Sequence, residues 1–292
     1  MSTSPLPDLT RWIAGRFQLG DTVGEGGLST VFAAWDHQLQ RHVAVKIMNA
    51  QPDHRVQAMQ TWREAMPASY LDHANIVRIY DYGVDEGRAY IVMELLEGET
   101  LEECLTRGPL HLGDFYRLAR QSLEGLVAAH AAGFVHRDLK PGNFMLQRVP
   151  GEPFHVKILD FGLAKFVNVP RPQSTDHYNT LLGSIHYMAP EQFERRPVDV
   201  RTDLYSLGCI FYEALTSHNA FDADSVGALI DAHLNAWPQS LERLRPGLPD
   251  GLEDWVFSFL QKKPDARHQS AQDALDHLPK LSQSNVETQR LG

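Results

Sequence analysis

The residues best suited to chemistry lie in one short segment, residues 136–143, with the sequence HRDLKPGN. Asp138 can accept a proton from a hydroxyl group, Lys140 can neutralise a phosphate oxygen, and Asn143 offers an oxygen to a metal ion. The segment follows an apolar, alanine-rich stretch, residues 126–132, which predicts a helix that would hold the polar loop in place. A base, a cation and a metal ligand this close together suit phosphoryl transfer, because that reaction depends mainly on positioning and charge neutralisation.

This segment resembles the catalytic loop of protein kinases. A His-Arg-Asp tripeptide alone would indicate only a solvated charged loop, but Lys140 and Asn143 stand in register with it. The form Leu-Lys-Pro-x-Asn is similar to that of the serine/threonine branch of the family. The resemblance implies that Asp138 and Lys140 are catalytic, and that Asn143 binds the metal ion, Mg²⁺ or Mn²⁺, that accompanies ATP.

The resemblance covers about residues 17–280 and implies a bilobal, protein-kinase-like fold of the α+β class. A β-rich N-lobe with one main helix would cover ATP, and a mainly helical C-lobe would carry the catalytic loop and bind the substrate. The expected parts are a flexible leader (1–16), the N-lobe (17–97), the C-lobe (98–280) and a polar tail (281–292).

Hydrophobic periodicity agrees with this division, because strand patterns dominate the first part of the chain and helical patterns the rest. The predicted strands are residues 17–20, 31–36, 42–47, 77–83 and 89–94. The predicted helices are residues 101–106, 111–132, 226–235, 252–261 and 271–277.

Composition and charge disfavour several classes of protein. The 292 residues carry a formal charge of −10, which makes nucleic acid an unfavourable partner. Cys104 and Cys209 lie in apolar helical patterns and are expected to be free thiols; the 14 histidines do not cluster with them, so we expect no structural zinc site. The longest apolar candidate, residues 207–215, contains Glu213 and is far shorter than the ~20 residues of a membrane span. We therefore expect a cytoplasmic protein with no membrane segment in this chain.

A glycine-rich segment, residues 24–31 with the sequence GEGGLSTV, separates the first two predicted strands. Its backbone N–H groups could approach phosphates closely, although an ordinary hairpin turn would have a similar composition. The resemblance implies that this segment covers ATP, with Ser29 where the family usually has a third glycine. The ATP-binding residues expected here are Val23, Gly24, Gly26, Ser29 and Val31.

Lys46 lies on a predicted strand with one buried face, where an unpaired lysine would be costly. Either it extends its ammonium group to the strand edge, or, as the resemblance implies, it holds the α- and β-phosphates of ATP and pairs with a carboxylate. Glu64 on the next helix is the expected partner, although a solvent-facing glutamate would look the same. Pro67 lies three residues later and is expected to kink or end that helix.

The resemblance also implies an adenine pocket. Val31 would cover the ring, Ala44 would leave room for it, and backbone groups of residues 94–96 would bond its edge. Met93 would lie at the back, and Met145 would close the pocket from below unless it is an ordinary core residue. The residues assigned to this pocket are Val31, Ala44, Met93, Glu94, Leu96 and Met145.

An apolar run, residues 156–159, ends in Asp-Phe-Gly seventeen residues after Asn143. The resemblance implies that Asp160 is the second metal ligand, bound to an ion that bridges the ATP phosphates. It also implies that Phe161 packs beneath the helix that carries Glu64.

Residues 163–187 lack periodicity and resemble the kinase activation segment, which ends in Ala-Pro-Glu at Glu191. Thr180 is the expected phosphorylation site, with Ser174 and Thr175 as further candidates, although a solvated, unmodified threonine fits equally well. Arg137 and Lys165 would pair with the phosphate. Ser184 replaces the threonine that the family generally bonds to its catalytic Asp and Lys.

Two further resemblances concern structural residues. Asp203 resembles the buried aspartate that supports the catalytic loop, and Arg267 resembles the partner of Glu191 in a buried ion pair. Both are expected to stabilise the fold without taking part in chemistry.

The resemblance implies a serine/threonine protein kinase that uses ATP, acts on protein substrates and phosphorylates its own activation segment, with a second copy of the chain as partner. A pseudokinase that binds nucleotide and acts as a scaffold is the alternative, but no catalytic position is lost. A kinase of small hydroxylated molecules is disfavoured by the full activation segment.

Overall fold

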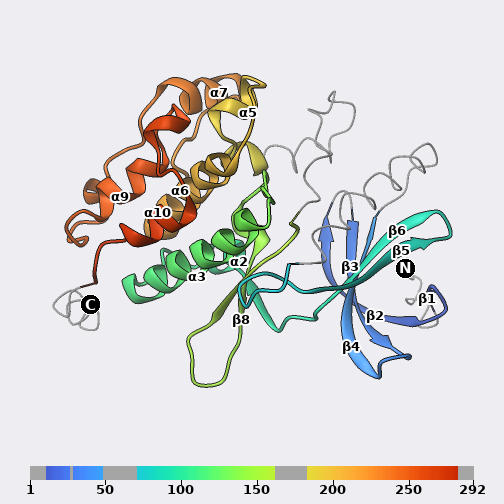
Figure 1. Ribbon diagram of the computed structural model, residues 1–292. Coiled ribbons are helices and arrows are strands. Elements are labelled where there is room, and N and C mark those ends of the chain that lie inside the picture. The colour runs from blue at the N-terminus through green and yellow to red at the C-terminus, as the bar shows by residue number, and fades with distance from the viewer. Residues whose placement is uncertain (1–10, 27–28, 49–70, 162–182, 282–292) are drawn as a thin grey trace, which may run out of the picture. The chain divides into compact units, whose positions relative to one another are not determined.

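The computed structural model describes residues 11–26, 29–48, 71–161 and 183–281 (Figure 1). The described residues fall into two compact units. The first lies within Met1–Asp72 and Val77–Leu96, and the second within His73–Ile76 and Glu97–Gly292. Each unit has its own hydrophobic core, and each is described separately below.

The first unit is a six-stranded antiparallel sheet with the strand order β1-β2-β3-β4-β6-β5 (Figure 1). Its strands are β1 (Trp12–Ile13), β2 (Phe17–Gly26), β3 (Ser29–Asp36), β4 (Arg41–Met48), β5 (Ile79–Asp85) and β6 (Arg88–Met93). Alternate residues of β2, β4 and β6 face one side and bury Phe17, Val43, Val45 and Val92 in its core. All five predicted strands are confirmed, but β2 continues to Gly26, well beyond its predicted end at residue 20.

A buried carboxylate ties the first strands of this unit together. Asp36 is fully buried and accepts hydrogen bonds from Arg16 Nε at 2.8 Å and Arg16 Nη2 at 2.7 Å. It also accepts from the backbone N–H groups of Gln38 and Leu39 in the turn after β3. Arg16 Nη1 reaches Asp81 of β5 at 2.8 Å. The hydrogen bonds from Arg16 lower the pKa of Asp36 to about 2, even though burial alone would raise it.

The second unit is mainly helical and contains a small antiparallel sheet, β7-β8-β9. Its strands are β7 (Gly98–Thr100), β8 (Phe144–Gln147) and β9 (His155–Ile158). Its helices are α2 (Leu101–Leu105), α3 (Leu112–Ala131), η2 (Pro141–Asn143), α5 (Pro190–Phe193), α6 (Val200–Thr216), α7 (Val226–Asn235), α8 (Leu241–Leu244), α9 (Leu252–Phe259), η4 (Pro264–Ala266) and α10 (Ala271–Asp276). The five predicted helices are confirmed as α2, α3, α7, α9 and α10, with ends within two residues of the structure.

Helix α6 is the centre of this unit and is buried on nearly all sides, as its apolar sequence predicts. It packs against α3 on one side and α9 on another. Gly208 makes the second contact possible, because a Cβ atom at this position would lie only 2.5 Å from Cβ of Phe259. Among the described residues, no helix combines the length and the apolar character needed to cross a bilayer.

Candidate active site

The polar loop 136–143 follows α3 and is held from below by Asp203 in the first turn of α6. Asp203 is fully buried, and its two carboxylate oxygens accept the backbone N–H groups of His136 at 2.8 Å and Arg137 at 2.7 Å. His130, near the end of α3, places Nε2 2.9 Å from the same carboxylate. A rigid, buried helix therefore sets the backbone position of the loop.

His136 joins this loop to the segment that follows β9. Its ring is buried, and Nε2 donates a hydrogen bond to the carbonyl oxygen of Leu159 at 2.8 Å. Because Nε2 carries the hydrogen, Nδ1 can accept from the backbone N–H of Asp138, 3.3 Å away. The ring also meets Phe161 edge to face, with 4.8 Å between the centroids. His136 thus positions Asp138 and contacts the residue that follows Asp160.

Two residues of the site adopt left-handed backbone conformations that side chains other than glycine rarely adopt. Arg137 has a φ of 68° and Asp160 a φ of 60°. Such conformations cost about 1–3 kcal/mol each and persist where the surroundings enforce them. At Arg137 two hydrogen bonds hold this conformation, because its N–H donates to Asp203 and its carbonyl oxygen accepts from Gln192 Nε2 at 3.0 Å.

The loop brings together the three side chains in which the sequence indicates chemistry. Lys140 Nζ lies 3.8 Å from Asp138 Oδ2 and donates a hydrogen bond to Ser184 Oγ at 3.2 Å. Asn143 belongs to the 3₁₀ helix η2, and its Nδ2 donates to the backbone carbonyl of Asp138 at 2.7 Å. The side chains of Asp138 and Lys140 are only half-buried, so a hydroxyl group can approach them.

The two expected metal ligands come from neighbouring segments. Phe144, next to Asn143, pairs with Ile158 in the sheet, and the N–H of Leu159 donates to the carbonyl of Asn143 at 2.8 Å. This pairing brings Asp160 to the segment that carries Asn143. The amide nitrogen of Asn143 is engaged by Asp138, so its oxygen is the atom that can bind a cation. A carboxylate and an amide oxygen form the kind of donor set that Mg²⁺ prefers.

In the first unit, four of the residues predicted to bind ATP share one face of the sheet. Val31 of β3 is directly opposite Lys46 of β4, and Ala44 of β4 is opposite Met93 of β6. Directly opposed residues point to the same side of a sheet, as do residues two apart on a strand. Val31, Ala44, Lys46 and Met93 therefore line one surface.

The described residues of the glycine-rich segment, 24–26 and 29–31, lie in strands rather than in a loop. Gly24 and Gly26 lie in β2 opposite Val31 and Ser29 of β3. The register shifts twice between Leu19 and Gly24, which indicates bulges that twist the strand. Val23 beside them is 54% exposed and available from solvent.

Of the remaining predicted site residues, the structure describes Glu94, Leu96 and Met145. The N–H of Glu94 donates to the carbonyl of Arg78 at 3.0 Å, and Leu96 ends the first unit. Met145 lies on β8 of the second unit, opposite Thr100 and Lys157. Glu64, Pro67, Lys165, Ser174, Thr175 and Thr180 lie outside the described residues.

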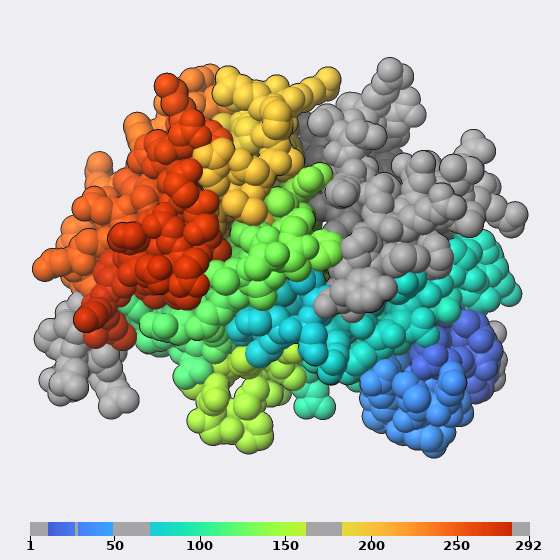
Figure 2. All heavy atoms as spheres, in the orientation of Figure 1, coloured from blue at the N-terminus to red at the C-terminus, as the bar shows by residue number. Residues whose placement is uncertain are grey.

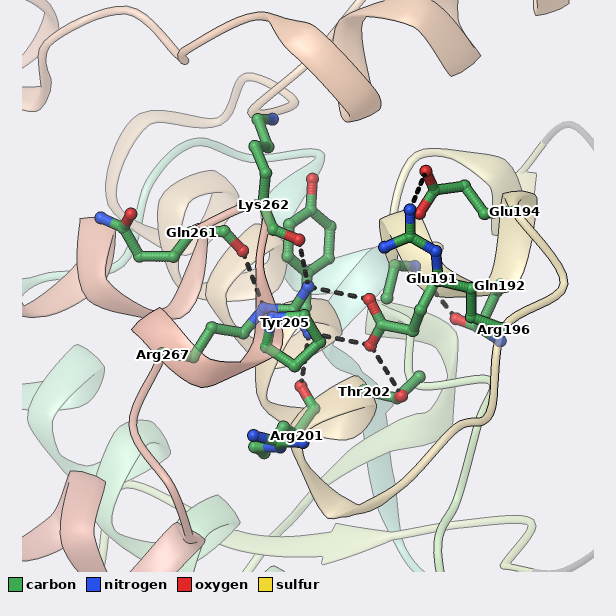
Figure 3. A network of polar contacts seen from close by, with 12 residues as sticks. Glu191, Gln192, Glu194, Arg196, Arg201, Thr202, Tyr205, Gln261, Lys262 and Arg267 are labelled. Atoms are coloured by element: carbon green, nitrogen blue, oxygen red, sulfur yellow. Dashed lines mark hydrogen bonds and ion pairs between the residues drawn. The ribbon is translucent and has the colours of Figure 1, made fainter.

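Glu191 and Arg267 form a buried ion pair in the second unit (Figure 3). The side chain of Arg267 is 0% exposed and that of Glu191 is 4% exposed. Nη1 and Nη2 donate to the two carboxylate oxygens at 2.9 and 2.8 Å, and Thr202 Oγ1 donates to Glu191 Oε1 at 2.8 Å. Burial raises the pKa of Glu191, but the hydrogen bonds and charge of Arg267 outweigh it, and the pKa ends below its ordinary value.

Sequence reasoning missed two residues that position the loop, His130 and Gln192. His130 approaches Asp203, 73 residues away in the chain, and Gln192 reaches the carbonyl of Arg137 across 55 residues. The only signal for His130 was a histidine within the apolar stretch 126–132 at the end of its helix. Gln192 carried no signal, because its partners are backbone groups.

Comparisons with known proteins show which sequences and structures the chain is similar to. The family model described as "Protein kinase domain" matches residues 17–278. Serine/threonine-protein kinase PrkC of Bacillus subtilis (strain 168) is 36% identical over 263 residues, which cover 89% of this chain and 40% of PrkC. Serine/threonine-protein kinase PknB of Mycobacterium leprae (strain TN) is 34% identical over 265 residues, covering 89% of this chain and 42% of PknB. The chain thus spans less than half the length of these curated relatives.

The structure is also similar to a solved one. The crystal structure of Rad53 1-466 in complex with AMP-PNP matches with a TM-score of 0.73 and 27% sequence identity. The match covers 90% of this chain and 65% of that one.

Proposed function

We propose that this chain, which belongs to the protein kinase family, transfers the γ-phosphoryl group of ATP to serine and threonine hydroxyls of proteins. The family and the α+β kinase fold, both expected from the motifs, are confirmed by the comparisons. The observation that carries the proposal is the loop 136–143, in which Asp138, Lys140 and Asn143 are all present and close together. Asn143 Nδ2 donates a hydrogen bond to the backbone carbonyl of Asp138, and Lys140 Nζ lies 3.8 Å from Asp138 Oδ2.

In the proposed reaction, the substrate hydroxyl oxygen forms a bond to the γ-phosphorus while the bond to the β-phosphate oxygen breaks, which leaves ADP. Asp138 orients the hydroxyl group and accepts its proton. Lys140 neutralises charge on the phosphoryl oxygens, and its hydrogen bond to Ser184 keeps it beside Asp138. ATP supplies the phosphoryl group, and the divalent cation that kinases use screens its charge.

The donor set supports Mg²⁺ as that cation, with Mn²⁺ as a substitute. Asn143 and Asp160 would hold it through oxygen atoms, which suit a hard cation. Lys46 would hold the α- and β-phosphates with Glu64 as its partner. Gly24, Gly26 and Ser29 would cover the phosphates, and the remaining ATP contacts would come from Val23, Val31, Ala44, Met93, Glu94, Leu96 and Met145.

We assign residues 17–97 to an ATP-covering lobe and residues 98–280 to a catalytic, substrate-binding lobe. Phe161, which packs on His136, would support Asp160, and the Glu191–Arg267 pair and Asp203 would hold the second lobe and its loop.

The decisive experiment measures phosphate transfer from labelled ATP with Mg²⁺, both to the chain itself and to a generic basic protein. Asp138→Asn should abolish incorporation and leave ATP binding intact. Asp254→Asn, which removes an exposed carboxylate of α9, should have no effect. ATP binding without incorporation in the unmodified chain would contradict the proposal and indicate a nucleotide-binding scaffold.

We propose further that the chain phosphorylates its own Thr180, with Ser174 and Thr175 as lesser sites. Arg137 supports this, because its buried Nε has no hydrogen-bond partner among the described residues and could bind a phosphate. Adding active protein and labelled ATP to Asp138→Asn protein tests transfer between two copies, since only the active copy can catalyse transfer from ATP to the variant. Peptide mapping after incubation with ATP that finds no phosphate in residues 174–184 would contradict this self-phosphorylation.

A further inference from the structure

Outside the candidate active site, two imidazoles and one carboxylate meet near the last helix of the second unit. His268 follows η4, Asp273 lies in the first turn of α10, and His277 caps the end of α10. His268 Nδ1 lies 3.5 Å from Asp273 Oδ2, and His277 Nδ1 lies 3.1 Å from Asp273 Oδ1. One ligand atom from each residue lies within 4.8 Å of the other two. The segment from η4 to α10, red in Figure 2, is at the surface of its unit.

Hydrogen bonding indicates which nitrogen of His268 carries a hydrogen. The hydroxyl of Ser258 donates its one hydrogen to the carbonyl of Trp255 at 2.6 Å. Ser258 Oγ must then accept from His268 Nε2, which is also 2.6 Å away. In the neutral ring, Nδ1 therefore presents a lone pair, and that lone pair faces the carboxylate of Asp273. Two hydrogen-bond acceptors that face each other repel, and a cation bound between them would relieve this repulsion.

We propose that His268, Asp273 and His277 bind a divalent transition metal ion, with Zn²⁺ the preferred one. Zn²⁺ binds histidine nitrogen and carboxylate oxygen at about 2.0–2.2 Å, so ligand atoms around a tetrahedral ion are about 3.3–3.5 Å apart. Each histidine Nδ1 lies at about this distance from one oxygen of Asp273, 3.5 Å from Oδ2 for His268 and 3.1 Å from Oδ1 for His277. With one ligand atom from each residue, the three atoms lie within 4.8 Å of one another, so small side-chain rotations would close the set around an ion. Two imidazoles disfavour Mg²⁺ and Ca²⁺, which prefer ligand sets made of oxygen.

The surroundings of the three side chains also resemble those of metal ligands. His268 is oriented by Ser258, and Asp273 Oδ2 accepts the backbone N–H of Gln269 at 2.9 Å. His277 Nδ1 lies 2.8 Å from the backbone carbonyl of Asp273, which only accepts, so the neutral ring carries its hydrogen on Nδ1 there. Metal binding through Nδ1 would require that hydrogen to move to Nε2, which faces solvent. The side chain of His277 is 68% exposed, which opens the site to solvent and leaves the fourth position to water.

Such a site would be structural rather than catalytic. It would connect the segment after η4 to the end of α10, directly beside Arg267 of the buried ion pair. A ligand that binds only the folded chain stabilises it by mass action, so the metal would raise the melting temperature. This inference departs from our expectation of no structural zinc site, which rested on the lack of histidines clustered with cysteines.

The test is zinc binding to chelator-treated chain by titration calorimetry, with excess Mg²⁺ present to occupy oxygen-rich sites. The unmodified chain should bind one more equivalent of Zn²⁺ than His277→Gln does, and the variant's affinity at this site should fall at least tenfold. His111→Gln, which removes an exposed histidine at the start of α3, is the matched control and should bind like the unmodified chain.

Thermal unfolding gives a second readout. Zn²⁺ should raise the melting temperature of the unmodified chain and of His111→Gln, but not of His277→Gln. Because His277 is exposed, the metal-free variant should melt like the unmodified chain. The proposal is overturned if the unmodified chain binds no Zn²⁺ in the micromolar range, or if His277→Gln binds and responds to it unchanged.

Discussion

Replacing Glu191 with glutamine should strongly destabilise the second unit, because it leaves a buried guanidinium without its counter-charge. A guanidinium has five N–H groups, and at Arg267 every one has an acceptor (Figure 3). Two donate to Glu191, and three donate to the backbone carbonyls of Arg201, Gln261 and Lys262. Glutamine keeps one acceptor and turns an NH₂ group toward a donor, so at least one buried N–H loses its partner.

The expected cost follows from these contacts. Breaking a buried ion pair by removing one partner costs on the order of 3–5 kcal/mol. The three carbonyls that remain around Arg267 partly offset its charge, which favours the lower end, about 3 kcal/mol. At roughly 2–4 °C per kcal/mol for a domain of this size, the melting temperature should fall by about 6–12 °C.

Urea unfolding followed by circular dichroism measures this cost, with Glu152→Gln as the matched control. Glu152 pairs with Arg117 at 2.9 Å, but both side chains are partly exposed, so its loss should cost less than about 1 kcal/mol. The contribution of Glu191 to the free energy of unfolding should be fully present at pH values above its ordinary pKa of about 4.3. It should decline as the pH falls through the lowered pKa of Glu191 in the folded chain. A Glu191→Gln variant within 1 kcal/mol of the unmodified chain at pH 7 would refute this reasoning.

Three further perturbations test other parts of the molecule. Burial lowers the pKa of His233 to about 3, so below about pH 6.5 the unfolded chain takes up a proton that the folded chain does not. Stability should therefore fall by about 2 kcal/mol between pH 7 and pH 5, and His233→Phe should lose that part of the slope in urea unfolding. Ser184→Ala removes the hydrogen bond to Lys140, which should lower kcat roughly 10–100-fold at unchanged KM for ATP, while Ser184→Thr should retain activity. Asp36→Asn weakens the bonds from Arg16 and should cost about 1.5–3 kcal/mol, measured by hydrogen exchange of β2 and β3 amides.

The sequence was most informative where a function depends on residues close together in the chain. The loop 136–143 was recognisable because its chemistry requires fixed residue types at fixed spacing. Helices α7 and α10 were also predictable, since Ser225 and Ser270 cap them by accepting backbone N–H groups at their first turns. Local signals of this kind need no tertiary information.

Features that arise from tertiary contact were the ones missed. Strand β2 runs on to Gly26 because β3 pairs with it as far as Ser29, whereas glycines alone suggested that the strand had ended. The cluster of His268, Asp273 and His277 depends on the turn between η4 and α10, which brings residues nine positions apart together. The spacing of cysteines and histidines in the sequence does not reveal that turn, so it could not predict the cluster.

The strained loop shows how far its geometry depends on other elements. The left-handed backbone at Arg137 costs about 1–3 kcal/mol, and the side-chain hydrogen bonds described within the segment HRDLKPGN engage its neighbour Asp138 but not the backbone groups of Arg137 itself. The compensation comes from outside the loop, as Asp203 on α6 accepts two of its N–H groups and Gln192 on α5 donates to the carbonyl of Arg137. Helix α6 is itself buried on nearly all sides and cannot shift without disturbing the core of its unit. The position of Asp138 is therefore set by the packing around α6. Substitutions in α6 or in the residues packed against it that leave the unit folded should lower kcat, even though these residues do not touch a substrate.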